Sequence, residues 1–149
     1  MKKVRGFTLL SEDAIMPKRA TRNSAGYDLY VPNTGKDVAI FPGEMEKITL
    51  NVAAYMQPDE VLMVFVRSSV GIKRGLVLAN GTGIIDSDYY GNPDNQGNII
   101  VALRNLSDEV QVVKSGEKVA QCIFTKYLVV DNDEPETEER IGGIGSTGK

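Results

Sequence analysis

The sequence predicts an all-β fold, a barrel or jelly roll, and three observations carry that prediction. Short apolar or alternating segments recur along the chain, and residues 61–66 (VLMVFV) form a continuous apolar run typical of a buried strand. Turn signals such as residues 41–44 (FPGE) and 57–60 (QPDE) separate these segments. Helical periodicity is scarce. Many short strands between frequent turns are typical of β-barrels and jelly rolls.

The strands can be placed in order along the chain. In the first, Phe7 and Leu9 alternate with Gly6 and Thr8. We expect strands over residues 4–10, 25–32, 61–66, 99–103, 110–113 and 119–127, and two short strands within residues 38–52 on either side of the Pro-Gly turn.

The chain of 149 residues suits one domain with a hydrophobic core, followed by a distinct tail. Residues 131–139 (DNDEPETEE) are acidic and contain no apolar side chain, so they cannot bury enough surface to order themselves. Four of the last eight residues are glycine. We therefore expect a β domain over residues 1–130, and an acidic linker with a flexible, Gly-rich C-terminal lid over residues 131–149.

Composition excludes several classes of protein. A net charge of −3 argues against a general nucleic-acid-binding protein, which is usually basic. The absence of His rules out a His-based triad and a His-ligated zinc site, and the single Cys122 rules out an intrachain disulfide. A divalent ion would need oxygen ligands, which points to Mg²⁺. No run is long and apolar enough to span a membrane, so the expected compartment is the cytoplasm.

Residues 80–91 (NGTGIIDSDYYG) are the richest stretch in candidate chemistry. Two glycines loosen the backbone before an apolar pair, and turn formers follow, so we expect a hairpin. Its interior would offer the amide of Asn80, the carboxylate of Asp86 and the ring of Tyr89. An amide can read a base edge, a carboxylate can take a proton from water, and a ring can cover a sugar. The alternative is an ordinary Asp-rich β-turn.

Four further stretches give this one a context. They are residues 25–29 (AGYDL), 67–71 (RSSVG), 116–121 (GEKVAQ) and 142–148 (GGIGSTG). In this order, and with the central stretch third, they resemble the five motifs of the trimeric dUTPase family, the deoxyuridine triphosphate nucleotidohydrolases. The resemblance runs from Ala25 to Gly148. It implies a jelly-roll-like β fold with one short helix, expected at residues 70–74, and hydrolysis of dUTP to dUMP and diphosphate with Mg²⁺.

The resemblance also implies roles for individual residues. Asp86 would orient the water that attacks the α-phosphate, and Asp28 would contact Mg²⁺ only through water. Asp28 lies between apolar residues, so a core ion pair with an arginine is the alternative. The other implied contacts are to substrate: Arg67, Ser68, Ser69, Gly71 and Gln121 for the phosphates; Asn80, Gly83 and Ile85 for uracil; Tyr89 for the deoxyribose; and Arg140, Ile144, Gly145, Ser146 and Thr147 from the tail.

The chain departs from the family pattern in the tail and near the phosphates. Ile144 stands where the family has a Phe that stacks on uracil. The family's γ-phosphate arginine lies one residue further upstream than Arg140, where this chain has Glu139, and we assign the role to Arg140 because a carboxylate cannot fill it. Val66 replaces a usual Pro, and Lys118 replaces a common Arg that could make a bidentate contact. Residues 92–98 (NPDNQGN) are a longer connection than usual, with no role evident from the sequence.

Two other functions use the same fold. A dCTP deaminase resembles dUTPases, but it carries a catalytic Glu in the strand after the central motif, where this chain has Ala102. A nucleotide-sensing regulator that binds a protein partner is the other alternative. The family resemblance further implies a homotrimer whose active sites are shared between subunits.

Overall fold

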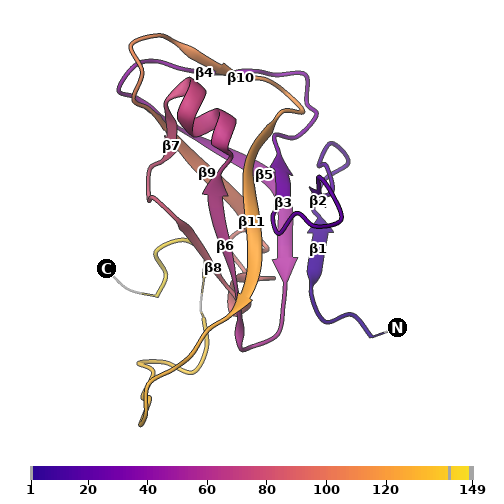
Figure 1. Cartoon of the computed structure of the whole chain (residues 1–149). Coiled ribbons are helices and arrows are strands. Elements are labelled where there is room, and N and C mark those ends of the chain that lie inside the picture. The colour runs from indigo at the N-terminus through magenta and orange to yellow at the C-terminus, as the bar shows by residue number, and fades with distance from the viewer. Residues whose placement is uncertain (1, 141, 148–149) are drawn as a thin grey trace.

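The computed structural model describes residues 2–140 and 142–147, and these residues build a β-sandwich with a small extra sheet at one end (Figure 1). The four-stranded sheet has the order β1 (Gly6–Leu9), β5 (Met45–Tyr55), β9 (Asn98–Asn105) and β7 (Leu76–Leu78). The five-stranded sheet has the order β2 (Lys18–Arg19), β3 (Tyr27–Tyr30), β11 (Lys118–Lys126), β6 (Glu60–Val66) and β8 (Gly83–Asp86). The extra sheet pairs β10 (Gln111–Val113) with β4 (Val38–Ile40).

The core lies between the two larger sheets, because each sheet buries one face. On β9, alternate side chains are buried, and Leu103 is fully so. On β6, Leu62 and Val64 are buried in the same cluster. β6 pairs with β11 on one side and β8 on the other, and its continuous apolar sequence gives one buried face and one half-buried face. The all-β, jelly-roll-like class predicted from the sequence is therefore confirmed.

Two helical turns interrupt the strands. The expected short helix appears as one turn of π-helix, η1 (Ser69–Lys73), directly after β6. A 3-10 turn, η2 (Ser87–Tyr89), follows β8. Both turns sit beside candidate site residues, because each begins where a strand of the five-stranded sheet ends.

The strand boundaries differ from the expectation at β5. Two short strands were expected within residues 38–52, but β5 runs for 11 residues, to Tyr55. The ladder with β9 shifts register between Thr49 and Ala53, where Asn51 adopts a positive φ of 59°. The Asn51 N–H donates to the side chain of Asn98 at 2.9 Å instead of joining the ladder. This bulge takes the polar residue out of register, so the strand continues beyond the point where its pattern predicts an end.

The expected hairpin around residues 80–91 is wrong. β7 pairs with β9, whereas β8 pairs with β6. The turn formers at residues 86–91 therefore lead from β8 to β9, which lies in the other sheet, instead of joining paired strands. The turn at residues 80–82 likewise crosses between the sheets. Turn-forming residues specify a reversal of the chain but not the partner strand. β8 is an edge strand of the five-stranded sheet. Its Ile85 faces the core, while Ile84 is 56% exposed.

The single cysteine is buried in the core. Burial, together with the charge of Asp28, raises the pKa of the Cys122 thiol to about 12. The thiol is thus a packing group. Among the described residues, no helix is long and apolar enough to cross a membrane.

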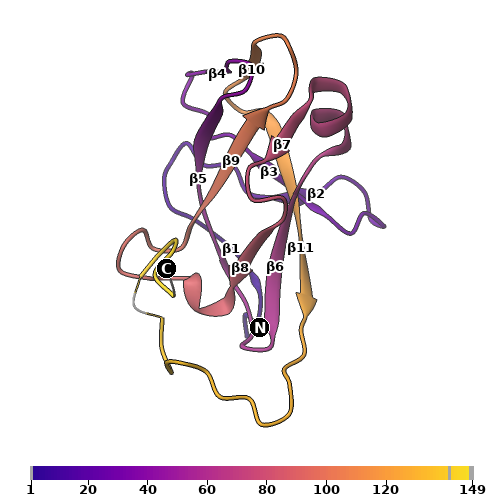
Figure 2. The same cartoon turned by 90° about the vertical axis from the view of Figure 1, so that its left-hand side faces the viewer.

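After β11 the chain has no strand or helix through residue 140. Residues 131–139 are exposed, as their acidic sequence predicted. They loop away from the sandwich and bring residues 142–147 back beside η2 and the loop that follows it (Figure 2). The described part of the tail therefore lies against the β domain, and its conformational freedom stays a prediction.

Candidate functional site

The first candidate site is a pocket of about 270 Å³ between β8 and the returning tail. Its floor comes from the core, since Val64 of β6 and Ile99 of β9 contribute from opposite sheets. Nine of the predicted site residues line it: Asn80, Gly83, Ile85, Asp86, Tyr89, Arg140, Ile144, Gly145 and Thr147. The structure thus brings together the central stretch and the tail, which lie some fifty residues apart in the sequence.

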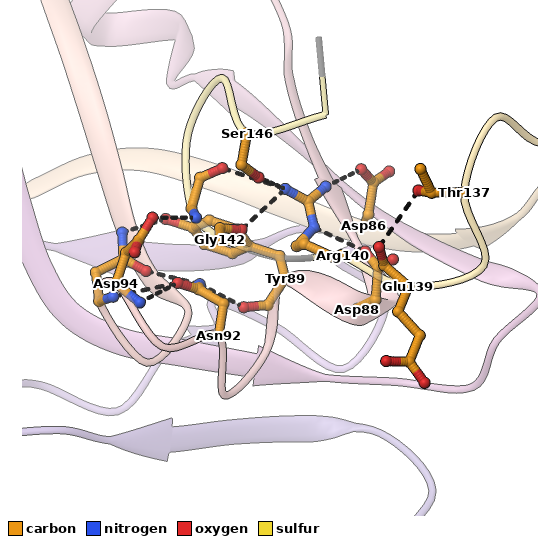
Figure 3. A network of polar contacts seen from close by, with 12 residues as sticks. Asp86, Asp88, Tyr89, Asn92, Asp94, Thr137, Glu139, Arg140, Gly142 and Ser146 are labelled. Carbon is orange, nitrogen blue, oxygen red and sulfur yellow. Dashed lines mark hydrogen bonds and ion pairs between the residues drawn. The ribbon is translucent and has the colours of Figure 1, made fainter.

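Two exposed carboxylates at the pocket bind the tail arginine (Figure 3). The Arg140 Nη2 lies 2.6 Å from Asp86 Oδ2, and its Nε lies 2.8 Å from Asp88 Oδ1. The hydrogen bond to Asp88 is the main cause that raises the pKa of the Arg140 guanidinium, and Asp86 adds to it. Only 8% of the Arg140 side chain is exposed. The arginine expected to bind the γ-phosphate therefore lies on the carboxylate expected to orient the water.

Tyr89 forms a wall of the pocket and is 7% exposed. Its hydroxyl donates to the backbone oxygen of Asn98 at 2.7 Å and accepts from the Asn95 amide at 2.8 Å. Burial raises the pKa of the phenol. The guanidinium of Arg140 lies 5.6 Å from the ring centroid, within cation–π range. The ring is thus fixed in place by contacts on both its edge and its face.

The residues expected to read the base line the same pocket. Asn80 is exposed in the turn after β7, so its amide is free to meet a ligand. Gly83 has no room for a side chain, since an added Cβ would lie 3.0 Å from Val64 Cβ. Because β8 is an edge strand of its sheet, one side of its backbone has no partner strand and is open to a ligand. Ile144 lines the pocket but is 73% exposed, so the lid is only partly packed.

A second pocket of about 330 Å³ gathers the remaining polar site residues except Ser146. Asp28, Arg67, Ser68, Ser69 and Gln121 line it, and none of them lines the first pocket. β3 and β11 are paired so that Asp28 lies directly across from Gln121. Two hydroxyls beside a guanidinium make this surface suited to phosphate oxygens.

Asp28 is buried here and is paired with two cations. Its Oδ1 lies 3.3 Å from Arg67 Nε, and its Oδ2 lies 3.5 Å from Lys118 Nζ. The structure therefore shows the ion pair that was the alternative to a metal-associated carboxylate. Ser68 precedes η1 but makes no side-chain capping bond, which leaves its hydroxyl available to a ligand.

Gly71 and Ser146 are not placed in either pocket. Gly71 lies in η1, donates its N–H to the Arg67 oxygen at 3.0 Å and faces Val66. Its N–H is therefore bonded within the turn that carries the two serines. Ser146 accepts from Arg140 Nη1 at 3.4 Å.

Sequence reasoning gave no role to several residues that shape the site. Asp88 is the second partner of Arg140, and its spacing of two from Asp86 was the available signal. Asp94 and Asn92 lie in the polar connection 92–98, where Asp94 accepts the Gly143 N–H at 2.7 Å. Their contacts join the loop to a segment fifty residues away, which no local pattern reveals.

The oxygen donors of the second pocket bear on whether the protein can hold Mg²⁺. No group of three His, Cys, Asp or Glu side chains within residues 2–140 and 142–147 is arranged to hold a metal ion. Asp28 opens onto the second pocket together with hydroxyl and amide oxygens. Hard oxygen donors of this kind fit Mg²⁺ that keeps most of its ligands from phosphate and water.

A β-sandwich with an amide- and carboxylate-lined pocket and a separate surface for anions has the features of a nucleotide-binding protein. The family model for dUTPase matches residues 12–148. The chain belongs to the dUTPase family. It is 47% identical to the deoxyuridine 5'-triphosphate nucleotidohydrolase of Lactococcus lactis subsp. lactis (strain IL1403), covering 98% of this chain and 99% of the relative. The corresponding protein of Desulfitobacterium hafniense (strain DSM 10664 / DCB-2) is 38% identical, over 89% and 87%.

Solved structures agree with this assignment. The crystal structure of the dUTPase from Streptococcus mutans is 42% identical, with a TM-score of 0.76, and the match covers 85% of this chain and 99% of that one. The dUTPase of Staphylococcus bacteriophage 80alpha is 24% identical with a TM-score of 0.73, over 91% and 98%. At that identity the phage protein supports the fold alone. A mutant dUTPase from phage phi11 of S. aureus, also 24% identical, coordinates a structural Mg(II) ion.

Proposed function

We propose that this chain hydrolyses dUTP to dUMP and diphosphate by in-line attack of water on the α-phosphate. The observation that carries the proposal is the first pocket, where a free amide, an exposed backbone edge, an aromatic wall and a carboxylate line one cavity of nucleoside size. Asn80 and the backbone of β8 read uracil, and Tyr89 lies against the deoxyribose. Membership of the dUTPase family supports the same reaction.

Asp86 orients and deprotonates the attacking water. Its carboxylate is 53% exposed at the mouth of the pocket, where water reaches it, and its partner Arg140 belongs to the tail. When a triphosphate enters, its γ-phosphate competes with Asp86 for the guanidinium. Transfer of Arg140 to the phosphate frees the carboxylate for the water.

The second pocket binds the phosphates. Arg67 and the hydroxyls of Ser68 and Ser69 donate to phosphate oxygens, and Gln121 adds an amide. Mg²⁺ bound to the triphosphate would neutralise charge that develops during attack. Asp28 would contact that ion through water, in exchange for one of its present contacts with Arg67 and Lys118.

A homotrimer with shared sites explains why the predicted site residues divide between two pockets that have no lining residue in common. One subunit supplies the nucleoside pocket and a neighbour supplies the phosphate surface. Residues 127–130 (YLVV) follow β11 as an exposed apolar run, and Leu128 is 96% exposed. Contact with another copy would remove this apolar surface from water.

Subunit mixing tests the shared site. Asp86→Asn and Arg67→Ala variants should each be inactive alone, because each lacks one half of every site. Mixed trimers reassembled from the two should regain part of the activity, since some sites then receive two intact halves. Failure of mixed assemblies to regain turnover would contradict the shared arrangement.

The deaminase alternative finds no support at Ala102, which occupies the position where that family carries its catalytic Glu. The first-pocket function is tested with a panel of dUTP, dCTP, dTTP and UTP, with and without Mg²⁺, followed by diphosphate and ammonia release. Of the four nucleotides, we expect only dUTP to release diphosphate rapidly. Comparable turnover of dCTP or dTTP, or ammonia from dCTP, would refute the assignment of the pocket.

A further inference from the structure

The connection between η2 and β9 is a built loop and not a loose insertion. Asn92 is only 5% exposed, and its amide donates to the Tyr89 oxygen at 2.7 Å and to Asn95 Oδ1 at 2.7 Å. Its own Oδ1 accepts the N–H groups of Asp94 and Asn95. Gly97 closes the loop at a φ of 87°, and a Cβ there would lie 2.8 Å from Tyr90 Cα. Side-chain and backbone contacts thus hold this loop in one shape.

This loop makes direct contact with the tail (Figure 3). Asp94 Oδ2 accepts the Gly143 N–H at 2.7 Å, a bond strengthened by the charge of the carboxylate. Gly142 and Gly143 are the buried residues of the described tail, whereas residues 144–147 are exposed. A Cβ added to Gly142 would collide with the Asp94 carboxylate. The glycine pair is therefore fitted to Asp94 by a hydrogen bond and by the lack of a side chain.

The same tail turn positions the arginine. The Gly143 oxygen accepts from Arg140 Nη1 at 3.3 Å, so a shift of the glycine pair displaces the guanidinium as well. Arg140 in turn reaches Asp86 and Asp88. The loop also contacts the pocket wall directly, through Asn95 and the Tyr89 hydroxyl. One loop thus connects the tail backbone, the arginine and the aromatic wall.

We propose that residues 92–97 are the docking site for the C-terminal lid, and that Asp94 is a positioning residue that holds Gly143 and thereby sets Arg140 and Ile144 over the pocket. The catalytic part of this inference rests on the proposed hydrolysis of dUTP. The docking part does not, because it concerns contacts between two segments of the chain itself. The lid then has two separable attachments: Arg140, which substrate can redirect, and the glycine pair, which stays on the loop.

Docking can be measured on the full-length protein without nucleotide. Trypsin cleaves after Arg140 only when this side chain leaves its carboxylate partners, so the rate of loss of residues 141–149, followed by mass spectrometry, reports undocking. Asp94→Ala should raise that rate about tenfold, equivalent to about 1.4 kcal/mol. Asp94→Asn keeps an oxygen acceptor and should restore part of the protection. The matched control is Asp108→Ala, an exposed loop aspartate outside both pockets, which should change nothing.

A double-mutant cycle tests the contact itself. The atoms nearest to an added Gly142 Cβ all belong to Asp94, so Gly142→Ala should expose Arg140 about as much as Asp94→Ala does. In the Asp94→Ala background the collision is gone, and Gly142→Ala should have little further effect. Additive effects, or an unchanged cleavage rate in Asp94→Ala, would overturn the docking site.

Steady-state kinetics with dUTP and Mg²⁺ completes the test. If Asp94 positions the lid, Asp94→Ala should lower kcat by about tenfold, and Asp94→Asn should recover part of it while both proteins keep the wild-type melting temperature. Protection lost with kcat unchanged would show docking without a catalytic consequence and would overturn the positioning role. Absence of dUTP hydrolysis in the wild type would refute the proposed function, while the cleavage rates would still decide whether the lid docks on the loop.

Discussion

Asp86→Asn and Asp88→Asn form a matched pair that isolates the role of the water-orienting carboxylate. Both aspartates are more than half exposed, and each makes one contact with Arg140, at 2.6 Å and 2.8 Å. Arg140 itself is only 8% exposed, but solvent reaches both carboxylates, and Asn keeps an oxygen that can accept from the guanidinium. We therefore take the value of a solvent-screened ion pair, about 0.2–1 kcal/mol, and expect either substitution to weaken lid docking by about fivefold. Loss of a general base costs a further factor of about 10²–10⁴, or about 2.7–5.4 kcal/mol of transition-state stabilisation. Only Asp86→Asn should incur this larger loss.

The assay is diphosphate release at saturating dUTP, with dUMP affinity measured alongside to confirm that the pocket is intact. We expect Asp86→Asn to lower kcat by at least a hundredfold, and Asp88→Asn to keep kcat within about fivefold of wild type. Equal losses in the two variants would show that their common effect is the release of Arg140. A loss under tenfold in Asp86→Asn would refute its assignment as the base.

Three other perturbations have defined outcomes. Tyr89→Phe should keep the preference for dUTP over UTP because the ring remains. Tyr89→Ala should narrow the ratio of kcat/KM for dUTP to that for UTP, and should also lower stability, since the ring is part of the core. An unchanged ratio in Tyr89→Ala would count against sugar selection. Deleting residues 140–149 should leave the elution volume in size exclusion unchanged and strongly lower kcat, and full activity of the truncated protein would show that the tail is only a chain end. Ile144→Phe should keep activity and tighten uracil binding. Hydrogen bonds, chiefly from Arg5, hold the pKa of the Glu60 carboxyl below its ordinary value of 4.5. This contribution to stability is present above pH 4.5 and is lost as the pH falls through the lowered pKa. Glu60→Gln should therefore lower Tm by roughly 2–4 °C at pH 7, and the difference in Tm between wild type and variant should shrink in stronger acid. If thermal melts gave the same difference in Tm at every pH in this range, the dependence of stability on Glu60 ionisation would be contradicted.

The strands were predictable because their signals are local. Apolar runs and Pro-Gly turns identified β6 and the break between β4 and β5. The length of β5 was not predictable, since its bulge depends on Asn51 meeting the side chain of Asn98 from another strand. The crossing of the chain between β7 and β8 likewise depends on which strands pair across the whole fold.

The same division holds for the candidate site. The motifs indicated Asp86 and Tyr89, and the chemistry of phosphate binding favoured Arg140 over Glu139; the structure brings all three predicted residues to one pocket. The sequence could not indicate that Arg140 would lie on Asp86, because the contact requires the tail to return across the sandwich. The contact between Asp94 and Gly143 has no local signature at all, and only the folded chain brings the two together.

The burial of Cys122 makes the chain a convenient subject for thiol labelling. With the thiol pKa at about 12, roughly one molecule in 10⁵ carries a thiolate at pH 7, and reagents also have no path to the sulfur while the core is closed. A cysteine introduced at Ser146 would therefore be modified alone under native conditions, and a fluorophore there would follow the approach and departure of the lid in real time. Slow labelling of Cys122 in the same sample would report opening of the whole sandwich, so one protein would reveal local and global motion through two well-separated rates.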